Sequence, residues 1–92
     1  GGLAGNALDQ NDREYMNQST TSTLETSKTG QSGNWQNPDS GNSGTITPTR
    51  TFQRSDGTYC REFSQTVNIG GEVQQAHGTA CRQPDGTWKI VE

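Results

Sequence analysis

The two cysteines, Cys60 and Cys81, have the most specific chemistry in this sequence of 92 residues. Between them lies Gly70-Gly71, a pair that predicts a tight β-hairpin turn. A two-residue loop there places Cys60 opposite Cys81 at a non-hydrogen-bonded position, where Cα atoms come within about 4.5 Å, as a disulfide requires. Two buried free thiols are the alternative, and two cysteines with one histidine are too few ligands for a structural zinc site. The spacing therefore predicts a Cys60–Cys81 disulfide and an oxidising compartment.

The same register brings together the side chains of a candidate hydrolase. Ser64 would lie opposite His77, with Glu62 two residues from Ser64 on the same face. Catalysis also needs a group that orients the base, a pocket that excludes water and donors for an oxyanion. A regular strand uses its amides in the sheet, and this face is otherwise polar, as on a solvated surface. We therefore expect no enzyme activity, no cofactor and no metal site. A histidine can act as a pH switch, but a single surface histidine such as His77 is usually inert.

Arginines and tryptophans are the remaining candidates for binding. The arginines of adjacent predicted strands would form either a patch for an anionic ligand or ion pairs with Glu62 and Glu72, and pairing is the simpler interpretation. Trp35 is the better candidate for a partly exposed aromatic residue, of the kind enriched in binding patches, although packing is favoured for it too. Trp88 is expected in the core. The candidate binding surface comprises five residues: Trp35, Arg50, Arg61, His77 and Arg82.

The composition excludes several classes of protein. Only 24% of the residues are hydrophobic and 18% are charged, but the net charge of -3 is too small for a typical disordered chain. Neither half of the sequence has the basic excess that nucleic-acid binding requires. No stretch approaches the roughly 20 apolar residues that span a bilayer. The chain begins at Gly1 and has no signal peptide, so we interpret it as part of a longer protein.

The hydrophobic pattern predicts one helix followed by five strands. The helix covers about residues 9–28, and Asn11 with Glu14 forms an alternative capping box that would start it later. Four apolar residues recur along it at helical spacing: Leu8, Tyr15, Met16 and Leu24. Turn signals divide the rest into strands at about residues 31–37, 44–54, 58–69, 72–82 and 87–91. The expected fold is α+β, with the helix packed on a five-stranded antiparallel meander.

The hairpin register also sorts the two faces of the sheet. With a three-residue Pro84-Asp85-Gly86 loop, one face collects the apolar residues expected beneath the helix: Tyr59, Phe63, Val67, Ala76, Ala80, Trp88 and Ile90. The side of Phe52 depends on the Asp56-Gly57 loop, since two residues there would turn it to this face and three to the other. Pro48 cannot donate to a ladder, so it is expected at an edge or a bulge.

Four segments resemble the 17 kDa surface-antigen family of Gram-negative outer-membrane lipoproteins. They are WQNPDSG at 35–41, TPTRTF at 47–52, YCREF at 59–63 and GTACRQPDGTW at 78–88. The resemblance covers about residues 8–92. It implies a lipidated N-terminal cysteine and a glycine-zipper segment upstream, of which residues 1–8 resemble the end, followed by the surface-antigen domain at 9–92. It implies no catalytic residue and no cofactor.

We therefore expect a non-enzymatic domain of the cell envelope, lipid-anchored at the outer membrane through the upstream segment. Its partner would be an envelope protein or a cell-wall component, or its role would be structural. The main alternative is a periplasmic inhibitor of a lysozyme or a protease, which suits a small disulfide-bonded β domain. The side of the membrane it faces and its oligomeric state stay open, although an unpaired edge strand would support edge-to-edge dimers.

Overall fold

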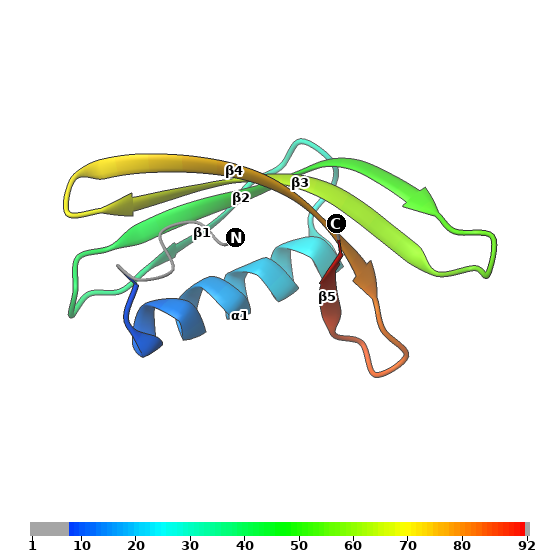
Figure 1. Cartoon of the computed structure of the whole chain (residues 1–92), viewed down its shortest axis with the longest axis horizontal. Coiled ribbons are helices and arrows are strands. Elements are labelled where there is room, and N and C mark those ends of the chain that lie inside the picture. Colours follow the sequence, from blue (N-terminus) through cyan, green and yellow to red (C-terminus); the bar gives the residue numbers. More distant parts are fainter. Residues whose placement is uncertain (1–7, 92) are drawn as a thin grey trace.

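One helix lies against one face of a five-stranded antiparallel sheet in the computed structural model, which describes residues 8–91 (Figure 1). The elements follow the chain as α1 (Gln10–Thr26), β1 (Gly33–Gln36), β2 (Ser43–Gln53), β3 (Tyr59–Ile69), β4 (Glu72–Arg82) and β5 (Trp88–Val91). The strand order is β1-β2-β3-β4-β5, so every strand pairs with its neighbour in sequence. The α+β meander expected from the sequence is confirmed. The family resemblance implies the end of a glycine-zipper segment at residues 1–8, and all of this segment except Leu8 lies outside the described residues.

Helix α1 begins at a capping box made by two aspartates. Asp9 is the N-cap and accepts from the backbone N–H of Asp12 at 2.7 Å, while the Asp12 carboxylate accepts from the N–H of Asp9 at 3.2 Å. The alternative start at Asn11 and Glu14 is therefore wrong. Asp9 with Asp12 and Asn11 with Glu14 both have the spacing of a capping box. However, Asp12 is also held by the loop between β1 and β2, and this tertiary contact fixes where the helix begins.

The Gly70-Gly71 turn sets the register of β3 and β4. Both glycines have positive φ, 59° and 89°, as a two-residue hairpin loop of the type I′ class requires. The turn pairs Ile69 with Glu72, and nine steps along the hairpin Cys60 lies opposite Cys81. Their Cα atoms are 4.0 Å apart and the two sulfur atoms are bonded. The predicted disulfide is confirmed.

Two side-chain clusters form the core between α1 and the sheet. The first contains Leu24, Ile46, Phe63 and Ala80, with Trp88 packed against it. The second contains Leu8, Trp35 and Val67, with Met16 and Ile69 packed against it. The helical stripe is correct at its ends, where Leu8 and Leu24 are buried, but its member Tyr15 is 40% exposed.

The apolar face predicted for the sheet extends further than the helix that covers it. Phe63, Val67 and Ala80 are buried there as expected, but Tyr59 and Ile90 are each 54% exposed. Figure 1 shows the reason, because the β2–β3 hairpin continues past the end of α1 and β5 lies only at that end. The register was predicted correctly, whereas the burial of these two residues was not.

A bulge and a three-residue loop decide which way the far half of β2 faces. The register shifts between Pro48 and Arg50, so the predicted bulge lies at the proline. At the hairpin tip, the N–H of Arg54 donates to the carbonyl of Thr58 at 2.8 Å, which leaves three residues in the loop. Phe52 therefore lies opposite Cys60, on the face away from α1.

Gly44 offers a direct test of the core around Trp35. A Cβ atom at this position would lie 2.7 Å from the carbonyl oxygen of Thr66 and would overlap the Trp35 indole. Gly44→Ala is expected to lower the free energy of unfolding by about 1–3 kcal/mol, as overpacked cores do. Urea denaturation measures this, with Ser43→Ala on the opposite face as the control. Equal stability of Gly44→Ala and the wild type would show that the indole does not lie against this glycine.

Candidate functional site

The face of the sheet away from α1, here called the outer face, carries the residues of the candidate hydrolase. Ser64 lies opposite His77, as the register predicts. Glu62, however, accepts a hydrogen bond from Arg50 at 2.7 Å, so its carboxylate is not positioned to orient the histidine. His77 is exposed and Ser64 is half-buried on the surface of a regular strand. The geometry brings the three residues to one face but does not supply the enclosed, oriented arrangement that nucleophilic catalysis needs.

Arg50 makes two contacts on the outer face. Besides its ion pair with Glu62, its guanidinium carbon lies 5.0 Å from the centroid of the Phe52 ring. The side chains of Arg50 and Glu62 are 65% and 40% exposed, so the pair contributes little to stability. The pairing interpretation of the sequence thus fits Arg50 and Glu62.

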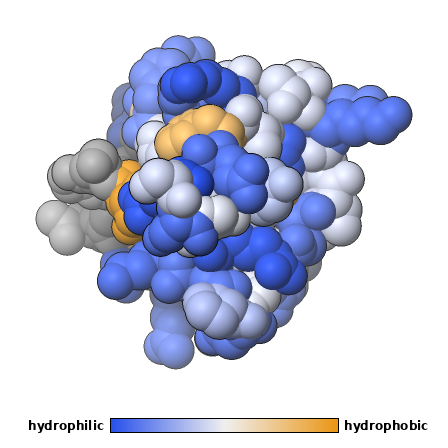
Figure 2. All heavy atoms as spheres, turned by 90° about the vertical axis from the view of Figure 1, so that its right-hand side faces the viewer, coloured by the Kyte–Doolittle hydropathy of each residue, from blue (hydrophilic) through white to orange (hydrophobic). Residues whose placement is uncertain are grey.

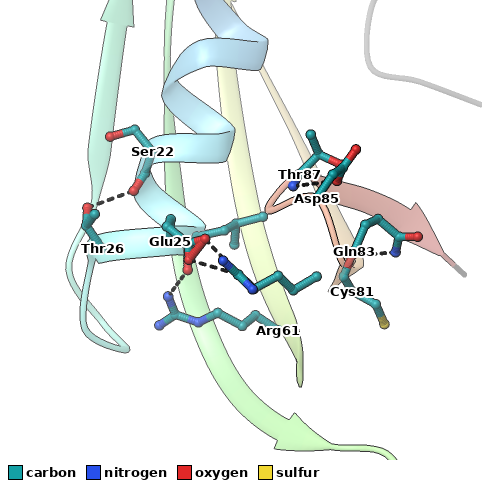
Figure 3. A network of polar contacts seen from close by, with 10 residues as sticks. Ser22, Glu25, Thr26, Arg61, Cys81, Gln83, Asp85 and Thr87 are labelled. Carbon is teal, nitrogen blue, oxygen red and sulfur yellow. Dashed lines mark hydrogen bonds and ion pairs between the residues drawn. The ribbon is translucent and has the colours of Figure 1, made fainter. Parts of the chain in front are cut away.

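Arg61 and Arg82 lie on the other face, where both contact the C-terminal end of α1. Figure 3 shows Arg61 beside this end of the helix, near Glu25. Arg61 is buried and donates to the carbonyl of Leu24 at 2.7 Å, so it satisfies a carbonyl that the end of the helix leaves without a partner. Burial lowers the pKa of its guanidinium. Arg82 pairs with Glu25 at 2.8 Å, not with Glu72. The three arginines are therefore divided between two faces and do not form one anionic-ligand patch.

A buried carboxylate, Asp12, is the polar centre at the opposite end of the helix. It is 0% exposed and accepts hydrogen bonds from three side chains of the loop between β1 and β2. Asn37 Nδ2 and Ser40 Oγ donate to one oxygen at 2.8 and 2.6 Å, and Asn42 Nδ2 donates to the other at 2.9 Å. Burial opposes ionisation, but these hydrogen bonds outweigh it and lower the pKa of Asp12 from 3.8 to about 2.

Sequence reasoning missed the role of Asp12. The sequence did contain an indication of it. Three polar residues with side-chain hydrogen-bond donors occur within six positions of the loop: Asn37, Ser40 and Asn42. Nothing local indicated which acceptor they would share. Each of the three donates one hydrogen bond to the carboxylate, so the cluster holds the loop against the helix and both oxygen atoms of Asp12 are already occupied.

The tryptophans differ in exposure. Trp35 is 6% exposed and packs with Leu8 and Val67, so the favoured interpretation, packing in the core, holds. Trp88 is only partly buried, and its buried Nε1 has no hydrogen-bond partner among the described residues. Trp35, predicted from the sequence to be the better candidate for partial exposure, is therefore the more buried of the two tryptophans. Gly44 lies opposite Trp35 in the sheet and leaves room for its indole, whereas Gly33 leaves room for the side chain of Thr23.

The remaining surface is mainly polar. An open recess of about 500 Å³ lies on the outer face, lined by Asn34, Trp35, Gln36, Ser43, Gly44, Thr45, Thr66 and Asn68. Figure 2 shows the end of the molecule at the right of Figure 1 as mainly hydrophilic, with hydrophobic surface only in small separate areas. Within residues 8–91, no three histidine, cysteine or acidic side chains come together to hold a metal ion, and no helix has the length and apolar character of a membrane span.

Comparison with known proteins gives one consistent result. A family described as 17 kDa outer membrane surface antigen matches residues 22–89. The 17 kDa surface antigen of Rickettsia bellii is 47% identical over 87 residues, which are 95% of this chain and 55% of the relative. That of Rickettsia conorii is 49% identical over 84 residues, 91% of this chain and 53% of the relative. The chain spans about half the length of these curated relatives. No solved structure matches.

Proposed function

The chain belongs to the 17 kDa outer membrane surface antigen family, and from this premise we propose that it is a non-enzymatic domain of the bacterial cell envelope. It would be held at the outer membrane by a lipid anchor upstream of the domain. There it would bind an envelope protein or a cell-wall component, or contribute structurally. The observation that carries the proposal is the family match over residues 22–89.

The disulfide supports this location. Cys60 and Cys81 are 0% and 1% exposed, so the bond is a structural one inside the fold. Disulfides of this kind persist in the periplasm or outside the cell and are rare in the cytosol. The polar surface and the small net charge of -3 also suit an envelope protein that meets many neighbours without strong electrostatic attraction.

Several charged side chains are already held in ion pairs and hydrogen bonds, which supports a role without catalysis. Glu62 is paired with Arg50, and Arg61 and Arg82 are used to hold the helix. No charged group of this set is left to polarise a substrate beside Ser64 and His77. A hydrolase activity that Ser64→Ala abolishes in an otherwise folded domain would contradict this part of the proposal.

The location is tested with the full-length protein, expressed with its natural upstream segment in a Gram-negative host. After inner and outer membranes are separated on a density gradient, the protein is expected in the outer-membrane fraction with its two thiols inaccessible to alkylation. The matched control is residues 1–92 alone, exported to the periplasm, which should appear in the periplasmic fraction. Full-length protein in the cytosol with free thiols would overturn the proposal.

A further inference from the structure

Within residues 8–91, the longest unpaired edge of the sheet belongs to β4. Strand β5 pairs with β4 only from Thr79 to Arg82. The part of β4 from Glu72 to Gly78 pairs with β3 on one side and has no described strand on the other. Its side chains are exposed or half-buried throughout, and Val73 is one of the few large hydrophobic residues at the surface, 61% exposed. This segment is here called the free edge.

Hydrogen-bond directions along β4 alternate, and they are set by the turns at its two ends. The Gly70-Gly71 turn closes on Ile69 and Glu72, so the even-numbered residues of β4 bond to β3. At the other end, the N–H of Gln83 donates to the carbonyl of Thr87 at 2.7 Å, so the odd-numbered residues bond toward β5. The backbone groups of Val73, Gln75 and His77 therefore point outward from the free edge. Only another extended chain offers donors and acceptors at the same repeat.

The other edge of the sheet is protected along β1 and the first half of β2. Strand β1 is only four residues long, and the chain before it covers β2, where the N–H of Gly30 donates to the carbonyl of Pro48 at 2.7 Å and Ser32 bonds to Thr47 at 2.6 Å. Short edge strands, prolines, lysines and bulges are the usual devices that prevent strand pairing between molecules. The free edge has none of them, and its only acidic or basic residue besides His77 is Glu72 at one end.

We propose that the free edge pairs with the free edge of a second copy of this chain, forming an antiparallel, two-fold symmetric dimer with one continuous sheet. Two antiparallel copies related by a two-fold axis place a residue opposite itself at that axis. With Gln74 at the axis, Val73 faces Gln75 of the second copy and Glu72 faces Ala76, so no like charges oppose. The Val73 and Gln75 backbone groups then form about four hydrogen bonds between the copies.

Space at the ends of the free edge favours this register. Strand β5 ends at Val91 opposite Thr79, in line with the free edge, so a second strand must stop short of it. Moving the axis to Gln75 would bring the Gly70-Gly71 turn of one copy against the end of β5 in the other. With the axis at Gln74, the turn of one copy and the end of β5 in the other are two residue positions further apart. The inference does not depend on where the protein resides in the cell.

Sedimentation and amide hydrogen exchange on the 92-residue chain test the dimer. Between micromolar and millimolar concentration, the apparent mass is expected to double, and exchange at Val73 and Gln75 is expected to slow. Exchange at Gln74 and Ala76, whose N–H groups already bond to β3, should change little by comparison. Gln75→Pro removes an outward N–H without removing a bond to β3 and should keep the chain monomeric. Val73→Lys leaves the backbone intact and should also keep the chain monomeric. It therefore tests the dimer even if the proline variant fails to fold.

Single cysteine variants test the axis. Gln74→Cys would lie opposite itself at a non-hydrogen-bonded position, where a disulfide fits, so mild oxidation should give a covalent dimer. Gln75→Cys, one residue away and equally exposed, is the matched control and should cross-link much less. A chain that stays monomeric at millimolar concentration, or a dimer that Gln75→Pro and Val73→Lys leave intact, would overturn the proposal. Cross-linking through Gln75→Cys in preference to Gln74→Cys would overturn the register.

Discussion

Replacing Cys60 and Cys81 together by alanine is expected to lower the free energy of unfolding by about 3 kcal/mol. The bond joins residues 21 apart, and closing a loop of this length restricts the unfolded chain by about that amount on the chain-entropy model. The folded domain has little to compensate with, because its core consists of two small clusters. Urea denaturation at neutral pH measures the loss, and the reduced wild type should lose a similar amount.

A matched control separates the bond from the strand pairing around it. Ser64 and His77 form a cross-strand pair on the same face and at the same kind of position, four residues along the hairpin. Replacing both by alanine should change the free energy of unfolding by less than about 0.5 kcal/mol each, as exposed positions usually do. If the cysteine and control variants were equally stable, the disulfide would not be what holds this hairpin.

The strands and the disulfide could be predicted because their signals are local. The Gly70-Gly71 turn and the positions of Cys60 and Cys81 each indicate the same register, and the structure has it. The face of Arg50 could not be predicted in the same way. It depends on whether the loop after Arg54 has two or three residues, and the sequence around Asp56-Gly57 permits both.

The partners of the polar side chains were the least predictable part of the molecule. Arg61 bonds to Leu24 and Arg82 to Glu25, contacts that span 37 and 57 residues. These contacts depend on where the end of α1 meets the sheet, which no periodicity specifies. The same holds for the limits of the apolar face, since the exposure of Tyr59 and Ile90 depends on how far the helix extends.

Asp12→Asn is expected to lower the free energy of unfolding at neutral pH by about 2–4 kcal/mol, because a buried acceptor is replaced by a group that is half donor. The new amide nitrogen would face the donors of Asn37, Ser40 or Asn42, and one of these buried groups would lose its partner. The helix would also lose one half of its capping box with Asp9. Urea denaturation measures the loss, and Asp39→Asn in the same loop, an exposed position, is the control.

The acid side of the stability curve gives a second, independent readout of Asp12. Its pKa is lowered in the folded state, from 3.8 to about 2, so folding favours the ionised form. The stabilisation is therefore complete above about pH 5 and is lost as the pH falls from about 4 to about 2, an effect of about 2 kcal/mol. Hydrogen bonds from Thr87 and Thr58 also lower the pKa values of Asp85 and Asp56, so the wild type has further acid dependence from its turns.

The difference between the wild type and Asp12→Asn isolates the contribution of Asp12, since Asp56 and Asp85 are common to both proteins. That difference should shrink as the pH falls from about 5 to about 2, because protonation removes the same charge that the substitution removes. The Asp39→Asn control should run parallel to the wild type over this range. A difference between wild type and Asp12→Asn that is constant with pH would show that Asp12 stabilises the loop by packing alone, without the ionised carboxylate at the centre of its hydrogen bonds.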